Sequence, residues 1–143
     1  MTPKRILCPV DFSECSRVAL DQACGLAQES AAKLFIVHVE KAGQSCPPGS
    51  AGYVEQLDQH KRLLTETVPS APDVDYQQHY LRGNTIDEIQ RFAKLREIDL
   101  IVMGTHGRTG LAKALMGNVS EALSQDPPCQ VITVAINKKA TTS

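Results

Sequence analysis

Hydrophobic and polar positions along the chain alternate between two periods, and this predicts strands and helices in turn. Five short runs rich in apolar residues are typical of strands, and the inner ones have the continuous apolar character of strands buried on both faces. Between these runs, apolar residues recur at helical spacing. We expect strands at Arg5–Val10, Lys33–Glu40, Val74–Leu81, Asp99–Met103 and Gln130–Ile136. We expect helices after Ser13 and after Asn84, at Tyr53–Thr67, and from about Leu111 to Ser124.

Local signals support the helix boundaries. Ser13 precedes the first helical segment as an expected N-cap, and Asn84 precedes the third with Asp87 three residues further on. Pro69 ends the second helical segment, since proline cannot continue a helix. Residues 41–52 are rich in Gly, Pro and Ser, so we expect a surface loop there.

This alternation predicts one α/β domain over residues 1–143, with 137–143 as a flexible tail. Strands separated by helices require crossover connections, so the sheet is expected to be mainly parallel and covered on both faces. Ligands of such sheets bind beyond the carboxyl ends of the strands, where the strand order reverses. The turns after the first and fourth strands are therefore the candidate binding segments.

Composition narrows the function classes. A formal net charge of −1 and scattered basic residues argue against a nucleic-acid partner. No apolar stretch is long enough for a membrane span, and the N-terminal residues do not resemble a secretory signal, so we expect a cytoplasmic protein. The five cysteines form no C-x-x-C pair, which excludes zinc-ribbon and thioredoxin-like motifs. We expect all five to be reduced and structural.

A glycine-rich turn follows the fourth expected strand. Gly104, Gly107 and Gly110 lie within seven residues, and Gly117 follows. Because glycine costs about 1 kcal/mol at a helical position, this cluster indicates a need for bare backbone. N–H groups near a helix N-terminus bind phosphate oxygens, so the turn favours a phosphate site. The spacing matches neither the P-loop motif nor the dinucleotide motif G-x-G-x-x-G.

Gly104, Gly107 and Gly117 form the pattern G-x2-G-x9-G between a DLIVMG strand and a closing VITV strand. With these residues the chain resembles the ATP-binding branch of the universal stress proteins. The resemblance covers nearly the whole chain, from ILCPVDFSECSRVAL through FIVHV and the Arg82-Gly83 turn to DLIVMGTHGRTG. It implies a Rossmann-like open sheet with strand order 3-2-1-4-5. The family has Ser or Thr after its last motif glycine, and Asn118 at this position is a departure that affects placement of the γ-phosphate.

The resemblance also implies roles for individual residues. Asp11 holds the ribose hydroxyls, for which a carboxylate is a suitable acceptor. Pro9 lies beside the base, the backbone of Val39 reads adenine, and Met103 and Gly104 line the ribose side. The expected nucleotide-binding set is completed by Val10, Gly107, Arg108, Gly117, Asn118 and Val119. The expected ligand is ATP, ADP or AMP, with Mg²⁺ or Mn²⁺ bound through the phosphates and not by protein side chains.

Other interpretations of these residues remain open. Asp11 is also suited to capping the first helix, and Arg108 is as well suited to a solvated loop as to a phosphate contact. His106 lies in the glycine turn but has no carboxylate partner nearby in sequence, so we do not expect it to be catalytic. The remaining histidines fall on different expected elements without ligand spacing, and no metal site is expected from His38, His60 and His79.

The resemblance implies a nucleotide-gated homodimer that regulates or protects in a stress response. Its last strand, Val131 to Val134, pairs with the same strand of a second copy. ATP orders the glycine turn and the 41–52 loop, and an unidentified protein partner senses the ordered surface. One alternative is an apo-type dimer that acts through protein contacts alone. Another is a slow ATPase or phosphotransferase, although the chain has neither a P-loop lysine nor an obvious base for efficient turnover.

Overall fold

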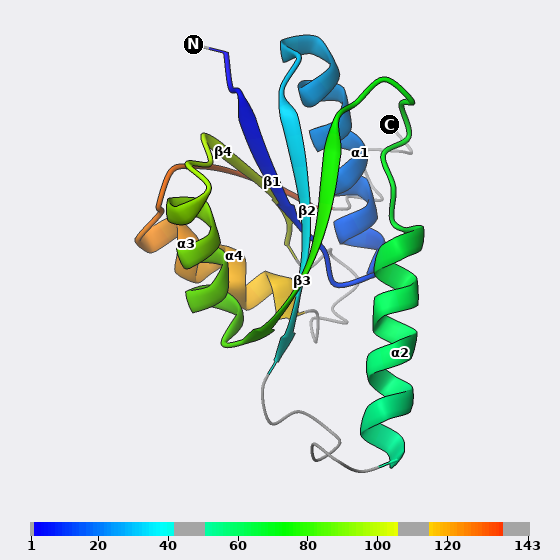
Figure 1. Ribbon diagram of the computed structural model, residues 1–143. Helices are drawn as coiled ribbons and strands as arrows, with labels where there is room; N and C mark the ends of the chain where they lie inside the picture. Colours follow the sequence, from blue (N-terminus) through cyan, green and yellow to red (C-terminus); the bar gives the residue numbers. More distant parts are fainter. Residues whose placement is uncertain (1, 42–50, 106–114, 136–143) are drawn as a thin grey trace, which may run out of the picture.

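The structure, a computed structural model, describes residues 2–41, 51–105 and 115–135. Strands and helices alternate along the chain, as the sequence predicts, and form a parallel sheet covered on both faces (Figure 1). In chain order, the elements are β1 (Arg5–Pro9), α1 (Glu14–Ser30), β2 (Lys33–Lys41), α2 (Ala51–Glu66), β3 (Tyr76–Gly83), α3 (Thr85–Leu95), β4 (Leu100–Gly104), α4 (Leu115–Gln125) and β5 (Gln130–Val134).

The sheet has the order β3-β2-β1-β4-β5, which confirms the expected fold class and strand order. All four strand pairs are parallel. Helices α1 and α2 lie on one side of the sheet and α3 and α4 on the other (Figure 1). The strand order reverses at β1, because the chain leaves β1 for β2 on one side and later returns to place β4 on the other. This reversal positions the carboxyl ends of β1 and β4 side by side.

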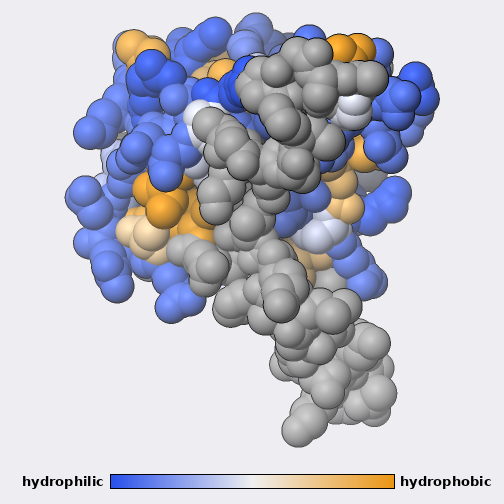
Figure 2. All heavy atoms as spheres, turned by 90° about the horizontal axis from the view of Figure 1, so that it is seen from below, coloured by the Kyte–Doolittle hydropathy of each residue, from blue (hydrophilic) through white to orange (hydrophobic). Residues whose placement is uncertain are grey.

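Two hydrophobic clusters, one on each face of the sheet, form the core. Alternate residues of a strand contribute to opposite clusters, since successive side chains point to opposite faces. In β1, Ile6 and Cys8 belong to the cluster beneath α1, and Leu7 belongs to the cluster beneath α3 and α4. Burial on both faces explains the unbroken apolar runs of the inner strands. On the face seen in Figure 2, the described surface is mainly hydrophilic with smaller hydrophobic areas.

Helix α1 begins and ends with defined caps. The Ser13 side chain accepts a hydrogen bond from the N–H of Ser16 at 3.2 Å, which confirms Ser13 as the N-cap. The helix ends at Ala31, whose φ of 55° lies in the left-handed region. The N–H groups of Ala31 and Ala32 both donate to the carbonyl of Ala27, which closes the final turn of the helix.

Gly25 lies in the middle of α1, exposed, and a Cβ added there would meet no atom within 4 Å. Replacement of Gly25 by Ala is therefore expected to stabilise the protein by about 1 kcal/mol, since glycine loses more backbone entropy on helix formation. Chemical denaturation checks this value through the midpoint. A lower midpoint for Gly25→Ala would mean that the glycine serves something other than the helix.

Helix α3 is capped as the sequence predicts. Asn84 accepts a hydrogen bond from the N–H of Asp87 at 3.0 Å through its side-chain oxygen. Asp87 and Glu88 occupy the first turn, where negative charge interacts favourably with the helix dipole. Gly83, immediately before the cap, has a φ of 144°, a conformation that other residues rarely adopt. Local chemistry thus determines where β3 stops and α3 begins.

The prediction placed β3 two residues too early, at Val74–Leu81, whereas the strand spans Tyr76–Gly83. Val74 is buried before the strand begins, so its apolar character belongs to the core and not to the strand. The pairing with β2 determines the boundary, since Tyr76 is the partner of Leu34 and Gly83 the partner of Lys41. The expected Leu111–Ser124 helix begins within the described residues at Leu115 and extends to Gln125.

The described cysteines are free, and they differ in burial. Cys8, Cys15 and Cys24 are buried, and Cys129 is half-buried just before β5 instead of inside a strand run. Burial raises the pKa of the Cys8 thiol well above its ordinary value, so Cys8 behaves as a core residue. Cys46 lies outside the described residues.

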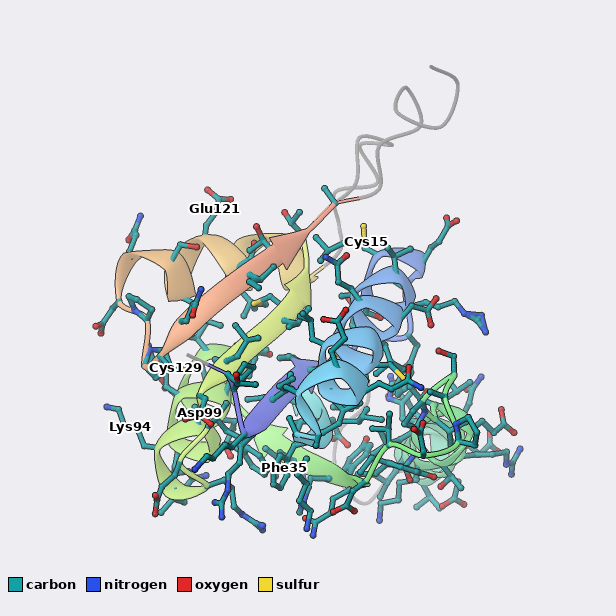
Figure 3. The ribbon with its side chains drawn as sticks, turned by 90° about the horizontal axis from the view of Figure 1, so that it is seen from above. Cys15, Phe35, Lys94, Asp99, Glu121 and Cys129 are labelled. Carbon is teal, nitrogen blue, oxygen red and sulfur yellow. The ribbon has the colours of Figure 1, made fainter. Side chains whose placement is uncertain are left out.

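The amino-terminal edge of the sheet is tied together by one carboxylate. The Asp99 side chain accepts from the N–H groups of Lys4 and Arg5 at 2.9 and 3.0 Å. Figure 3 shows Asp99 and Cys129 near each other at this edge, with Cys15 at the far end of the sheet. Glu121 projects from α4 away from the sheet in the same view, while Val119 and Leu123 of that helix are buried. The opposite, carboxyl-terminal edge is thereby left for a binding site.

Candidate functional site

The carboxyl ends of three neighbouring strands form the candidate site. Pro9 ends β1, Val39 lies near the end of β2, and Met103 and Gly104 end β4. Because these strands are parallel and adjacent, their ends lie at one edge of the sheet (Figure 1). The N–H of Val10 donates to the carbonyl of Val37 at 2.8 Å and continues the pairing one residue beyond β1. The structure therefore brings together the described residues that the resemblance assigns to base and ribose.

Asp11 comes directly after this pairing and is partly buried. Its Oδ1 accepts a hydrogen bond from the N–H of Ser13 at 3.0 Å, and its own N–H donates to the Ser16 hydroxyl at 3.4 Å. Ser16 is 2 % exposed, so the turn is anchored in the core. No hydrogen bond to Oδ2 is seen from residues 2–41, 51–105 or 115–135. One carboxylate oxygen thus shapes the turn, and the described residues leave the other without a hydrogen bond.

The structure decides whether Asp11 caps the first helix. Ser13, and not Asp11, is the N-cap residue of α1. Asp11 instead closes an Asx turn two residues before the helix. This structural role uses a single acceptor position of the carboxylate, and it is compatible with the ribose-binding role.

The expected site residues belong to different sides of the sheet. Val39, Met103 and Val119 are buried in the cluster beneath α3 and α4, with 6 %, 0 % and 5 % exposure. Val10 is buried in the opposite cluster, beneath α1. A ligand on the α4 side would therefore meet Val10 only through its backbone. The side chain of Met103 is also fully buried, which leaves its backbone as the group that can face a ligand.

The bare backbone at Gly104 is required by the fold itself. A Cβ at this position would lie 2.8 Å from both the carbonyl carbon and the carbonyl oxygen of Cys15, in the first turn of α1. Real Cβ atoms essentially never approach backbone so closely. The first glycine of the motif is therefore needed for contact between β4 and α1, whatever else it does.

Several expected phosphate-site residues lie outside what the structure describes. Gly107 and Arg108, together with His106, belong to residues 106–114. Gly117 and Asn118 fall within α4, but only the helical backbone is described there. Their roles toward phosphates remain predictions.

A cluster of aromatic and histidine rings next to Asp11 was missed from the sequence. Phe12, His38, His60 and Tyr80 come from the β1–α1 turn, β2, α2 and β3, and they form a chain of neighbouring rings. The pairing of β2 with β3 places His38 beside Tyr80, a signal that sequence spacing alone does not contain. Among residues 2–41, 51–105 and 115–135, no three His, Cys, Asp or Glu side chains form a metal-binding group.

Burial sets the protonation of His38. It is 8 % exposed, and its Nδ1 lies 2.8 Å from the carbonyl oxygen of Val10, so Nδ1 carries the hydrogen. Burial, and secondarily the charge of His60, lower the pKa of His38. The hydrogen bond to Val10 and the carboxylates of Asp11 and Glu40 oppose this change without overcoming it.

A cavity of about 450 Å³ lies between the β1–α1 turn, α1 and the end of α2. Arg17 and Leu20 line it from α1, and Leu63 and Glu66 line it from α2. Its lining does not include the site residues of β2 and β4. Val10, Phe12, Ser13 and Ser16 also line the cavity, so it borders the Asp11 turn from the side of α1 and α2. No helix in the described parts of the chain is long and apolar enough to cross a membrane.

Comparison with known proteins agrees with this architecture. The sequence matches the family described as the universal stress protein family over residues 2–135. It is 31 % identical over 143 residues to universal stress protein MJ0531 of Methanocaldococcus jannaschii, covering 95 % of this chain and 84 % of that protein.

Solved structures share the fold at lower sequence identity. One is the universal stress protein from Archaeoglobus fulgidus in complex with dAMP, with a TM-score of 0.70, 21 % identity, and coverage of 94 % of this chain and 99 % of that one. Another is a universal stress protein in complex with cAMP, with a TM-score of 0.64, 23 % identity, and coverage of 94 % and 98 %. The family match, the curated relative and the shared fold agree, and the chain belongs to the universal stress protein family.

Proposed function

We propose that this protein binds an adenine nucleotide at the carboxyl edge of the sheet, between the ends of β1 and β4. The observation that carries the proposal is the Asp11 carboxylate. One of its oxygens is held by the N–H of Ser13, and the other has no partner among the described residues. It lies where the strand order reverses, the usual ligand position in open α/β sheets.

The arrangement suits a nucleoside. A carboxylate oxygen at Asp11 accepts hydrogen bonds from ribose hydroxyls, and the backbone near Val39 offers polar groups to the adenine edge. Pro9, Val10, Met103 and Gly104 would enclose these parts of the ligand. Phosphates would extend toward the segment that carries the remaining expected residues: Gly107, Arg108, Gly117, Asn118 and Val119.

Two neighbours of the same fold support adenine as the recognised base. Their ligands, dAMP and cAMP, differ in sugar and phosphate but share adenine. For the present chain we propose ATP, ADP or AMP as the ligand. A Mg²⁺ or Mn²⁺ ion would be held by the phosphates, because the described residues offer no cluster of three metal ligands.

We further propose that the protein acts as a cytoplasmic homodimer in a stress response, with nucleotide binding as its regulatory signal. The edge strand β5 pairs with β4 on one side, and its other backbone edge is unpaired within the described residues. Val131 and Val134 are only partly buried in the single chain. Pairing of Val131 to Val134 with the same strand of a second copy would cover this edge.

The first test is chemical and thermal. Freshly purified protein is denatured, and any released nucleotide is identified by chromatography and mass spectrometry. The intact protein is then melted with and without Mg-ATP. A ligand at about 100 times its dissociation constant stabilises the native state by about 2.7 kcal/mol, which gives a clear rise in melting temperature. An empty protein that shows no shift with ATP, ADP, AMP or cAMP would contradict the proposal and leave the apo-type dimer.

A further inference from the structure

The Asp11 turn rests on a group of rings that the proposed binding role does not use. The ring centroids of Phe12 and His38 are 4.5 Å apart, those of His38 and His60 are 5.5 Å apart, and those of Phe12 and His60 are 5.9 Å apart. Tyr80 completes the group, with its centroid 5.5 Å from that of His38. We call these four residues the ring cluster. It connects α2 and β3 to the turn between β1 and α1.

His38 contacts the residue on each side of Asp11. Its Nδ1–H donates to the carbonyl oxygen of Val10, the residue before Asp11. Its ring packs against that of Phe12, the residue after Asp11. A single buried imidazole thus holds both neighbours of the proposed ribose-binding carboxylate.

The backbone at Phe12 needs this support. Phe12 has a φ of 66°, in the left-handed region that a bulky side chain rarely adopts. Such a conformation persists only where surrounding contacts determine it. The Phe12 ring contacts the rings of His38 and His60, and it also packs against the core cluster beneath α1. If the histidine rings move, the Phe12 backbone loses part of its support, and the direction of the Asp11 side chain changes with it.

We infer that His38 is a positioning residue for Asp11 and that protonation of His38 weakens nucleotide binding by loosening the Asp11 turn. This inference rests on the proposed function, because the affected property is binding of adenine nucleotide. His38 acts through Asp11 and need not touch the ligand.

The charged and titratable groups around His38 bear on how pH affects its protonation. Three such groups face His38: the carboxylates of Asp11 and Glu40 and the ring of His60. Glu40 is already engaged by the Tyr80 hydroxyl at 2.7 Å and by Arg82, whose Nε lies 3.5 Å from its carboxylate.

Two further features disfavour additional positive charge within the ring cluster. Lys61 lies over the Tyr80 ring, with its Nζ 5.7 Å from the centroid, and adds positive charge to the cluster. The Nδ1 atom of His60 is buried and has no hydrogen-bond partner among the described residues, so a hydrogen placed there would be a donor without a described acceptor. The closed ring cluster therefore disfavours a second proton on His38.

The sign of the pH effect follows from these contacts. Burial lowers the pKa of His38 in the folded protein, so the native state binds fewer protons than the unfolded state. The stability contributed by neutral His38 is complete above the ordinary histidine pKa of about 6.5 and is lost as the pH falls toward the lower folded value. Acid therefore favours any state in which the ring cluster opens.

The chain contains a matched control. His79 also has a pKa that burial lowers, but its ring packs against Phe35 and Phe92 on the other face of the sheet. It has no ring contact with the Asp11 turn. Acid destabilisation through His79 would act on the whole fold, whereas the effect through His38 would appear at the Asp11 turn.

The test compares the wild type with His38→Asn and His79→Asn. Asparagine at position 38 retains an N–H donor for the Val10 carbonyl and does not titrate. The dissociation constant for ATP is measured by calorimetry at about pH 7.5 and about pH 5.5. On acidification, we expect the affinity of the wild type for ATP to fall about tenfold more than the affinity of His38→Asn. His79→Asn is expected to behave like the wild type. Protonation of ATP itself contributes equally in all three proteins.

A loss of affinity in His38→Asn equal to that of the wild type would overturn the inference. If no variant binds ATP at either pH, the proposed function has failed, and a second measurement decides the inference separately. Hydrogen exchange of the backbone amides of residues 11–16 is followed in the nucleotide-free protein at both pH values, as protection factors. Acid should lower protection in the wild type and in His79→Asn but not in His38→Asn. Equal losses in all three proteins would show that the ring cluster does not control the turn.

Discussion

Replacement of Asp11 by Ala is expected to weaken adenine-nucleotide binding about 100-fold. Two charge-assisted hydrogen bonds to ribose hydroxyls would be lost, and a combined loss of about 3 kcal/mol corresponds to this factor. The Ala variant also removes the acceptor for the Ser13 N–H, so part of its effect arises in the protein and not at the ligand. Calorimetric titration with ATP measures the affinity, and the melting temperature of the free protein measures the structural part.

Asp11→Asn separates the two contributions. Its side-chain oxygen can still accept from the Ser13 N–H and close the turn, but the negative charge is lost. We expect stability close to that of the wild type together with clearly weaker binding, since neutral hydrogen bonds are about half as strong. Unchanged affinity in both Asp11→Ala and Asp11→Asn would place the ligand elsewhere on the protein.

Replacement of Gly104 by Ala is expected to destabilise the nucleotide-free protein by about 1–3 kcal/mol, the usual cost of overpacking. The added methyl group would lie 2.8 Å from the backbone carbonyl of Cys15, which cannot move without displacing the start of α1. Because the Asp11 turn leads directly into this helix, we expect weaker nucleotide binding as a second consequence. Denaturation without ligand measures the first effect, and titration with ATP the second.

Gly25→Ala provides the control, because it adds the same methyl group at an exposed glycine of α1 where no atom lies within 4 Å, and it is expected to stabilise the protein. If Gly104→Ala were as stable as the wild type without nucleotide and only lost affinity, the glycine would serve the ligand and not the contact with α1. The two measurements therefore separate the structural and binding explanations of the glycine motif.

Most of the architecture could be predicted from the sequence, because it depends on interactions between residues that are close together along the chain. The caps at Ser13 and Asn84 could be predicted because a short polar side chain binds N–H groups only a few residues away. The inner strands could be predicted because burial on both faces requires an unbroken apolar run. The resemblance pointed to Asp11 directly after a buried strand, and its role toward ribose stays a prediction. Each of these features depends on residues close together along the chain.

Tertiary structure decided what depends on distant residues. The start of β3 follows from its pairing with Lys33–Lys41 and not from the apolar character of Val74. The need for glycine at position 104 comes from Cys15, a contact between β4 and α1. The ring cluster combines four elements, and only the register of β2 and β3 places His38 beside Tyr80. The spacing of residues along the sequence contains none of these contacts, because they arise only when the strands pair with one another and the helices pack against the sheet.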